Sequence, residues 1–220
     1  MTDADFKAQA IRLHDRYLLE IVEPLGLCPW ARRSRLDGRT KQIVLLDADV
    51  PGALDATRAA IAALTREEKI EVGFVIFPRI DLGRSDFDRF VARVNEREVA
   101  AHEVGTVPFV MAAFHPDARA DEGTPERLIP FLRRTPDPCI QLVRSRVLDA
   151  VRANTPQGTS FIDAATFDFS TLRDEIPLRE RIARTNMTTV NRVGLGEVTR
   201  LFDEIRADRD RTYAALRSAP

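Results

Sequence analysis

Apolar residues in the first half of the chain switch between the spacing of a helix and the spacing of a strand. Apolar positions three or four residues apart predict a long first helix that ends near Pro24 and Gly26. Its inward residues are Phe6, Ala10, Leu13, Tyr17, Ile21 and Val22. The same spacing predicts an alanine-rich helix over Ala53–Arg66 and another helix after Ser85, with Phe87, Phe90, Val91 and Val94 inward. Short apolar runs predict strands over Gln42–Leu46, Glu71–Phe77 and Val107–Phe114.

The second half of the chain is more helical in pattern. Asp137-Pro138 resembles an N-cap followed by proline at the first helical position, which predicts a helix running to about Ala153. Asn154–Asp174 has turn residues followed by alternating apolar residues, and both a hairpin and an extended flap fit this pattern. The chain is predicted to be helical again from Leu178, to break at Gly194-Leu195-Gly196 and to close with a helix over Glu197–Leu216.

Alternating strands and helices followed by helices alone indicate the α/β class. We expect a small mixed or partly parallel sheet of three to four strands, flanked by helices, with a mostly helical C-terminal part. The nearly continuous apolar strands require cover on both faces of that sheet. With 220 residues and 44% hydrophobic residues, the chain is expected to form a single globular domain over residues 1–220.

Charge content limits the possible partners, and cysteine content bears on the cellular location. A formal net charge of −1 gives no overall field for nucleic acid or for a membrane surface, so we expect neither as a partner. The acidic start, Met1 to Asp5, lacks the features of a signal peptide, and no apolar run is long enough to span a bilayer. Two cysteines do not make a disulfide framework, so a reducing, cytoplasmic location fits best. The oligomeric state is not predicted.

Candidate chemistry lies in short segments that contain proline. Cys28 lies in Gly26-Leu27-Cys28-Pro29-Trp30, and a helix starting at Pro29 would make it an N-cap residue. Cys139 follows Pro138 and would lie in the first turn of the next predicted helix. A helix N-terminus and nearby arginines stabilise a thiolate, so either cysteine could be a nucleophile. The alternative is that each is a small buried apolar residue.

One of the three histidines ends a strand. His115, in Phe114-His115-Pro116, follows the strand predicted over Val107–Phe114, and ligands gather at strand ends in open α/β sheets. It could act as a general base, a metal ligand or a thiol partner, with Asp117 orienting it, or it could simply cap the strand. His14, beside the apolar face of the first helix, is interpreted as structural, and His102 as a solvated helix-end residue.

Arginines are candidates for anion binding, because only three of the 33 basic residues are lysines and a guanidinium group binds planar anions through two parallel hydrogen bonds. Arg133, Arg134, Arg144 and Arg146 could line an anion pocket near the Pro136 turn, and Arg181, Arg184 and Arg192 form a second, helical set. Solvated helix faces would show the same residues. The chain has no Walker loop, no dinucleotide fingerprint, no nucleophile elbow and no zinc-type ligand spacing, so no metal is predicted and the cofactor is unknown.

These segments, in this order, resemble the bacterial family known as domain of unknown function 1415. Family segments Gly-x-Cys-Pro-Phe-Ala, Phe-His-Pro and Asn-Arg-Ser-Pro-Tyr-Pro are similar to 26–31, 114–116 and 133–138 here. A family helix His-Leu-Leu-Arg-Glu is similar to 141–145, with Gln141 and Ser145 in place of histidine and glutamate, and Arg184-Thr185-Asn186 is loosely similar to an Arg-Asn segment. The resemblance spans roughly residues 17–194. It implies that the chain has a site like that of the family, but it does not identify a reaction.

Three hypotheses about function follow. The first is a cytosolic enzyme that acts on a small anionic molecule, with Cys28 as nucleophile or ligand, His115 as base or ligand, and Arg134 and Arg144 as anion clamps. It predicts that Cys28, His115 and Arg134 converge in one pocket. The second is a metal- or cofactor-binding module built from Cys28 and His115 with Cys139 or Asp117. The third is an interaction or structural protein in which these segments are turns.

Overall fold

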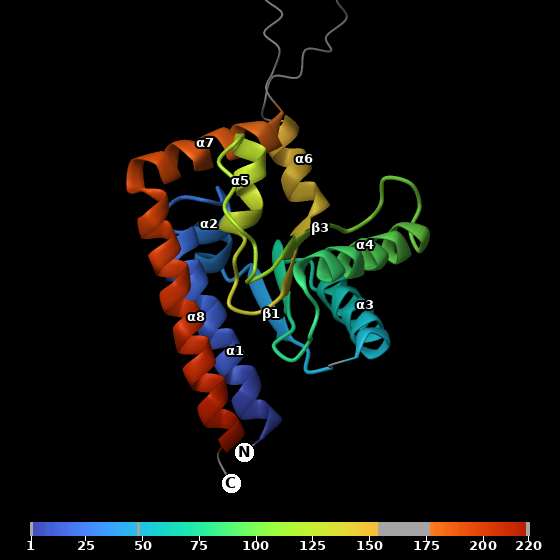
Figure 1. Cartoon of the computed structure of the whole chain (residues 1–220). Coiled ribbons are helices and arrows are strands. Elements are labelled where there is room, and N and C mark those ends of the chain that lie inside the picture. The colour runs from blue at the N-terminus through green and yellow to red at the C-terminus, as the bar shows by residue number, and fades with distance from the viewer. Residues whose placement is uncertain (1, 48, 154–176, 219–220) are drawn as a thin grey trace, which may run out of the picture.

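A computed structural model describes residues 2–47, 49–153 and 177–218 of the chain (Figure 1). Its helices are α1 (Asp3–Tyr17), the π-helical η1 (Leu18–Val22), α2 (Ala31–Leu36), α3 (Val50–Arg66), α4 (Arg84–Ala100), α5 (Pro125–Leu132), α6 (Ser145–Ala153), α7 (Leu178–Val193) and α8 (Leu195–Ser218). Its strands are β1 (Thr40–Val44), β2 (Val72–Ile76), β3 (Phe109–Phe114) and β4 (Cys139–Arg144). The predicted α/β class is therefore confirmed.

The four strands form one mixed sheet in the order β1-β2-β4-β3. β1 and β2 are parallel, whereas β4 is antiparallel to both of its neighbours, β2 and β3. β2 is buried along its whole length, which agrees with its uninterrupted apolar sequence. The expectation of a partly parallel sheet is confirmed, and the central position of β4 places its side chains in the middle of both sheet faces.

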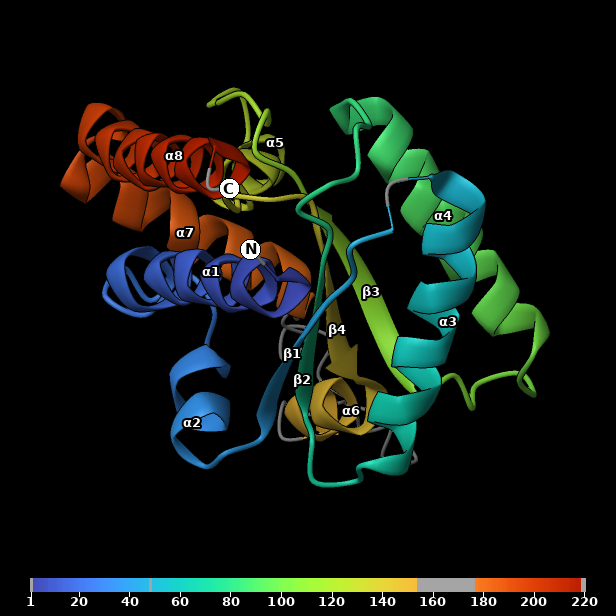
Figure 2. The same ribbon diagram turned by 90° about the horizontal axis from the view of Figure 1, so that it is seen from below.

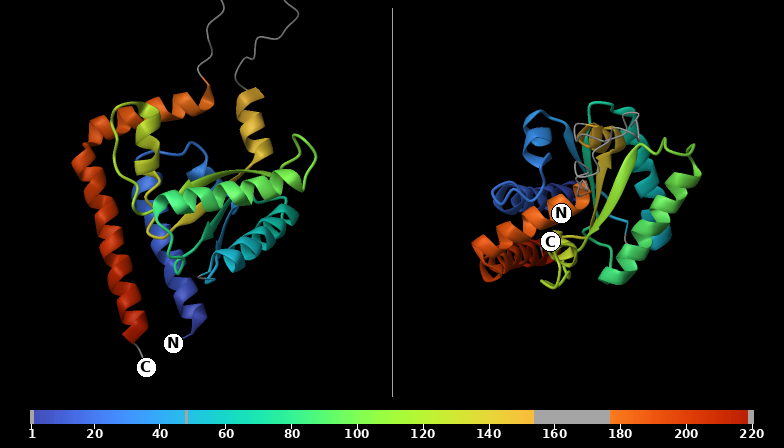
Figure 3. Two further views of the ribbon diagram at one scale, coloured as in Figure 1. Left: turned by 45° about the vertical axis from the view of Figure 1, so that its right-hand side comes forward. Right: turned by 90° about the horizontal axis from the view of Figure 1, so that it is seen from above.

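Helices cover both faces of the sheet, as Figure 2 shows, with α1, α7 and α8 on one side and α3 and α4 on the other. Side chains alternate along each strand, so each face has its own core. Phe74, Ile76 and Phe114 pack with α1, α5, α7 and α8. Val75 and Phe109 pack with α3 and α4. The two views of Figure 3 show the same division of helices and place both chain ends at one end of the molecule, where α1 runs beside α8.

The helix predicted from Asp137 is wrong for its first half, because residues 139–144 form β4. Asp137 does not cap a helix. Its two carboxylate oxygens accept hydrogen bonds from Arg209 Nε (2.7 Å) and Tyr213 Oη (2.6 Å), which fasten α8 to the start of the strand. The largely apolar run Cys139–Val143 pairs with β2 on one side and with β3 on the other. This pairing and burial outweigh the local capping signal.

The remaining predicted elements agree with the structure within a few residues, and α5 is a short helix that the sequence analysis does not predict. α5 begins at Pro125 and is capped by Thr124 Oγ1, which accepts from the Arg127 amide (3.3 Å), a signal the sequence carries openly. α2 begins at Ala31, so Cys28 lies before the helix rather than at its N-cap. The expected break at Gly194 separates α7 from α8. The hairpin or flap suggested for Asn154–Asp174 lies outside the described residues.

Candidate functional site

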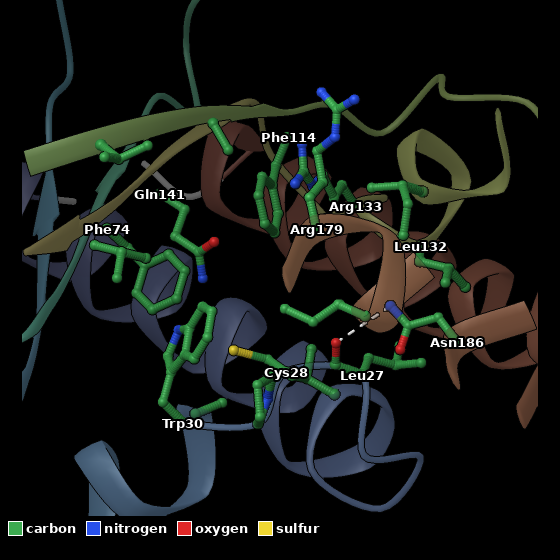
Figure 4. Close-up of a pocket in the computed structure, with 18 of the residues that line it drawn as sticks. Leu27, Cys28, Trp30, Phe74, Phe114, Leu132, Arg133, Gln141, Arg179 and Asn186 are labelled. Carbon is green, nitrogen blue, oxygen red and sulfur yellow. Dashed lines mark hydrogen bonds between the residues drawn. The ribbon is translucent and has the colours of Figure 1, made fainter. Parts of the chain in front are cut away.

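A pocket of about 480 Å³ lies on the sheet face that α1 and α7 cover. Its floor is formed by side chains at alternate strand positions: Phe74 on β2, Gln141 and Val143 on β4, and Val110, Ala112 and Phe114 on β3. Facing the floor are η1 and the turn that follows it, and α5, α6 and α7 close the sides. The polar side chains that enter this largely apolar space are therefore the ones to consider for chemistry (Figure 4).

The turn after η1 carries Cys28 to the pocket wall. In η1 the Glu23 amide donates to Leu18 O (2.9 Å), five residues back, and this wider turn presents both Leu18 and Val22 to the pocket. Gly26 then takes a positive φ of 62°, which glycine adopts without strain. The chain reverses there, and Figure 4 shows the Cys28 sulfur pointing into the pocket beside the Trp30 ring.

The Cys28 thiol is neutral at physiological pH. Burial raises its pKa to about 11, although hydrogen bonds from the Trp30 and Ala31 backbone amides and the positive charge of Arg133 act in the opposite direction. These three groups already favour the thiolate. A further positive charge in the pocket would therefore lower the pKa of this thiol.

Arg133 supplies a cation to the same pocket. It follows α5, and its carbonyl accepts from the His115 amide (3.0 Å), which holds the backbone against the end of β3. Its guanidinium carbon lies 5.3 Å from the centre of the Phe114 ring. Burial lowers the pKa of Arg133, and among the described residues no carboxylate forms an ion pair with it. Within the described ranges, the positive charge that Arg133 brings to the pocket therefore has no ion-pair partner.

Three more polar groups reach the pocket. Gln141 lies in register with Phe74 and Ala112, and Figure 4 shows its amide directed into the space, with no hydrogen-bond partner among the described residues. The indole nitrogen of Trp30 is fully buried and also lacks a partner within the described ranges. Asn186 of α7 is 4% exposed and donates to Leu27 O (3.3 Å). Within the described residues, Gln141 therefore has hydrogen-bonding capacity that is not used, whereas the amide nitrogen of Asn186 already has an acceptor.

The structure does not bring the four candidate residues Cys28, His115, Arg134 and Arg144 together. Cys28 lines the pocket and the other three do not. The expected convergence of Cys28, His115 and Arg134 is therefore wrong. In two of the segments a sequence neighbour lines the pocket instead, Phe114 next to His115 and Arg133 next to Arg134.

His115 lies on the α4 face of the sheet, with its ring 5.8 Å from that of Phe87. Its Nε2 donates to Leu82 O (2.9 Å), because a carbonyl can only accept, and its Nδ1 accepts from the Asp117 amide (3.2 Å). Asp117 therefore orients it through the backbone, while the Asp117 carboxylate pairs with Arg206 (3.0 Å). Both ring nitrogens are occupied, and the side chain holds two loops together.

The two expected anion clamps have structural partners. Arg134 donates to Pro116 O (3.2 Å) and Asp203 Oδ1 (3.0 Å), and its guanidinium stacks over Phe202 of α8. Arg144 donates to Ile70 O (2.7 Å), Leu64 O (2.9 Å) and Glu67 O (3.1 Å). It thereby joins the end of α3 to Ile70, ahead of β2, and adds a second donor to Leu64 O and Glu67 O, which also accept from the amides of Glu67 (3.2 Å) and Ile70 (2.9 Å). Neither guanidinium is free to bind an anion.

Cys139 is buried in β4 and pairs with a histidine that the sequence marked as structural. Its sulfur lies 3.9 Å from His14 Nε2, and His14 Nδ1 donates to Gln42 Oε1 (3.0 Å). Burial raises the pKa of Cys139 and lowers that of His14 to about 4, so both are neutral. The described residues contain no group of three side chains able to hold a metal ion.

Among the polar residues of the pocket, Arg133 belongs to the arginine group that the sequence predicts to line an anion pocket, whereas the sequence predicts no such role for Trp30, Gln141, Arg179 or Asn186. The sequence does contain a signal for Gln141, because it is the single polar residue in the apolar run Cys139–Val143. Read as a strand, that run puts Gln141 on the face opposite to its neighbours. Arg179 and Asn186 share one face of α7. No pattern in the sequence predicts that this face lies close to β4.

Comparison with known proteins supplies a family but no activity. No curated protein and no solved structure matches the chain. None of the helices in the described ranges is long and apolar enough to cross a membrane. Residues 9–166, which include all four strands and the Cys28 and Gln141 segments, match a family model described as a protein of unknown function. The chain belongs to that family, DUF1415, as the resemblance of its motifs implied.

Proposed function

We propose that this chain binds a small molecule that combines an apolar body with an anionic group. The observation that carries the proposal is the Arg133 guanidinium, which lines an apolar pocket with no carboxylate paired to it in the described part of the chain. A cation removed from water costs free energy unless an opposite charge compensates it. An anionic ligand would provide that charge, so the pocket should favour anions over neutral molecules of equal size.

The walls support an apolar body for the ligand. Leu18, Val22, Phe74, Phe114 and Leu132 face a cavity of about 480 Å³, which is in the range of small-molecule sites. The amides of Gln141 and Asn186 add hydrogen-bonding groups that would orient a ligand rather than supply most of its affinity.

A second candidate function is an enzyme that uses Cys28 as its nucleophile. It is favoured by the two backbone amides, of Trp30 and Ala31, that donate to the sulfur and would stabilise a thiolate. The described lining contains no histidine, aspartate or glutamate, so in this reading the substrate itself would have to accept the thiol proton. We rank binding first for that reason. We propose no role for His115, Arg134 or Arg144 in such a reaction, because their side chains form hydrogen bonds that fix loops and helix ends.

We also propose a cytoplasmic location. Both Cys28 and Cys139 are free thiols, as is usual where the surroundings are reducing. Fractionation of the native host, probed with an antibody to the chain, would test this, and enrichment in an extracytoplasmic fraction would contradict it.

The binding proposal can be tested through Trp30, because it is the only tryptophan in the chain and lines the pocket. Octanoate, octanol and octylammonium are titrated while the tryptophan emission is recorded. We expect octanoate to bind most tightly and octylammonium least. Arg133→Gln should remove the preference for the anion, whereas Arg33→Gln, which changes an exposed arginine on α2, should retain it. Equal affinity for octanoate and octanol in the unmodified protein would contradict the proposal.

The thiol can be followed in the same protein. With a pKa of about 11, Cys28 should react with iodoacetamide at a rate that rises about tenfold per pH unit from pH 7 to pH 10. Octanoate should protect it from alkylation. A rate that levels off near pH 8 would show a thiol activated for nucleophilic chemistry and would favour the enzyme over simple binding.

A further inference from the structure

We infer that the anionic group of the ligand is a phosphate monoester held between Arg133 and Arg179. This inference rests on the proposed function, because it specifies the ligand of the same pocket. In Figure 4 the two arginines lie at one end of the pocket, beside Phe114, whereas Cys28 and Trp30 lie at the other. The phosphate end and the apolar end of a ligand would therefore be separated along the pocket.

Arg179 is the second cation of the pocket and comes from a different element. It is the second residue of α7, lies at the exposed rim and has no ion-pair partner among the residues described. The neighbouring carboxylate, Glu180, is bound instead by Arg184 (2.5 Å), one turn further along the helix. Two arginines thus meet at one end of the pocket while the nearest acidic group on α7 is engaged elsewhere.

Packing of α7 determines which of its residues meet the pocket. Ile182 and Asn186 line the pocket together with Arg179, and the spacings of three and four residues put all three on one face of the helix. The hydrogen bond from Asn186 to Leu27 O ties that face to the turn that carries Cys28. Ala183 and Val190, on the same helix, are fully buried. The backbone of Arg179 is therefore held in place, and only its side chain remains to adjust to a ligand.

The charge of the site selects among anions. Two guanidinium groups and no lining carboxylate in the described ranges leave two positive charges at one end of an apolar cavity. A carboxylate or a sulfate ester carries one negative charge and would leave an excess positive charge. A phosphate monoester carries about two negative charges at neutral pH and has three terminal oxygens, enough for one arginine fork on each side. We therefore assign the two-arginine end to a dianionic phosphate.

The test compares two ligands of the same shape. Octyl phosphate and octyl sulfate share a tetrahedral head and an eight-carbon tail, but at pH 7.5 the phosphate carries about one more negative charge. Their dissociation constants are measured by calorimetry and by Trp30 emission. We expect octyl phosphate to bind about tenfold more tightly. At pH 5.5, where the phosphate is mainly a monoanion, the difference should disappear.

Variants separate this inference from the proposed function. Arg179→Gln should bind both ligands more weakly than the unmodified protein does, and should lose most of its preference for octyl phosphate over octyl sulfate. Arg192→Gln, at the other end of α7, should behave like the unmodified protein. Equal affinity for the two ligands, or an undiminished phosphate preference in Arg179→Gln, would overturn the inference while leaving a pocket for apolar anions. Failure of both ligands to bind would overturn the proposed function itself.

Discussion

His14 should make the stability of this protein depend on pH between about 6.5 and 4. The ring is fully buried, with its centre 4.5 Å from that of Phe74. Nδ1 carries the proton, because Gln42 Oε1 can only accept, and Nε2 faces the Cys139 thiol. The nearest carboxylate in this network, Asp15, is separated from the ring by the Gln42 amide. In the part of the chain that the structure describes, no carboxylate is in contact with this imidazole to compensate a second proton.

The magnitude follows from the two pKa values. Burial lowers the pKa of His14 to about 4 in the folded protein, against about 6.5 in the unfolded chain. Between these values the unfolded chain binds more protons, so the free energy of unfolding rises with pH. The contribution of His14 is complete above about pH 6.5 and is lost as the pH falls through 4. A difference of about 2.5 pKa units corresponds to about 3 kcal/mol, most of which is lost by pH 4.5.

Urea unfolding from pH 7.5 to pH 4.5 measures this contribution. The unmodified protein should lose about 2.5 kcal/mol more over that range than His14→Gln, in which a residue of similar size cannot take up the proton. Carboxylates that titrate in the same range are common to both proteins and cancel in the comparison. In His102→Gln the buried His14 is intact, so the full pH dependence should remain. Identical pH profiles for the unmodified protein and His14→Gln would refute the reasoning.

Two further changes test the contacts that hold the pocket in place. Arg144→Met should lower the free energy of unfolding by about 2–4 kcal/mol, because three hydrogen bonds from a buried guanidinium to carbonyls between α3 and β2 are lost, whereas Arg146→Met at the exposed surface should change it little, as urea midpoints would show. An equal loss in both variants would argue against this role. Gly26→Ala should cost about 1 kcal/mol and weaken octanoate binding, because φ there is +62°, whereas Gly83→Ala, with a negative φ and open space, should be nearly neutral. Unchanged binding in Gly26→Ala would show that this turn does not position the pocket.

Much of the fold could be predicted from periodicity. β2 is recognisable because a strand buried on both faces must be apolar throughout, and α3 and α4 because their apolar residues recur at helical spacing. β4 could not be predicted in this way. Asp137-Pro138 has the form of a helix start, and only the pairing of β4 with β2 and β3, far away in the sequence, makes the following residues a strand.

The candidate site shows the same division at the level of single residues. Proline-containing segments marked the right stretches of chain, since 27–31, 114 and 133 all line the pocket. Within those stretches, Cys28 lines the pocket as expected, whereas His115 and Arg134 lie outside it. Near the end of a strand, a step of one residue moves a side chain to the other face of the sheet. His115 therefore faces α4 while Phe114 faces the pocket.

The sequence by itself determined the class of fold, most of its elements, the segments that carry reactive residues and the family. Local spacing and turn chemistry specify these features, and they do not depend on distant residues. Tertiary structure alone decided which side chains share a space. Cys28 and Arg133 come from two connecting segments, Gln141 from β4 and Arg179 from α7, and the packing of α7 against the rest of the chain brings Arg179 to the other three. Such long-range contacts follow from the burial of whole faces, which no local pattern records.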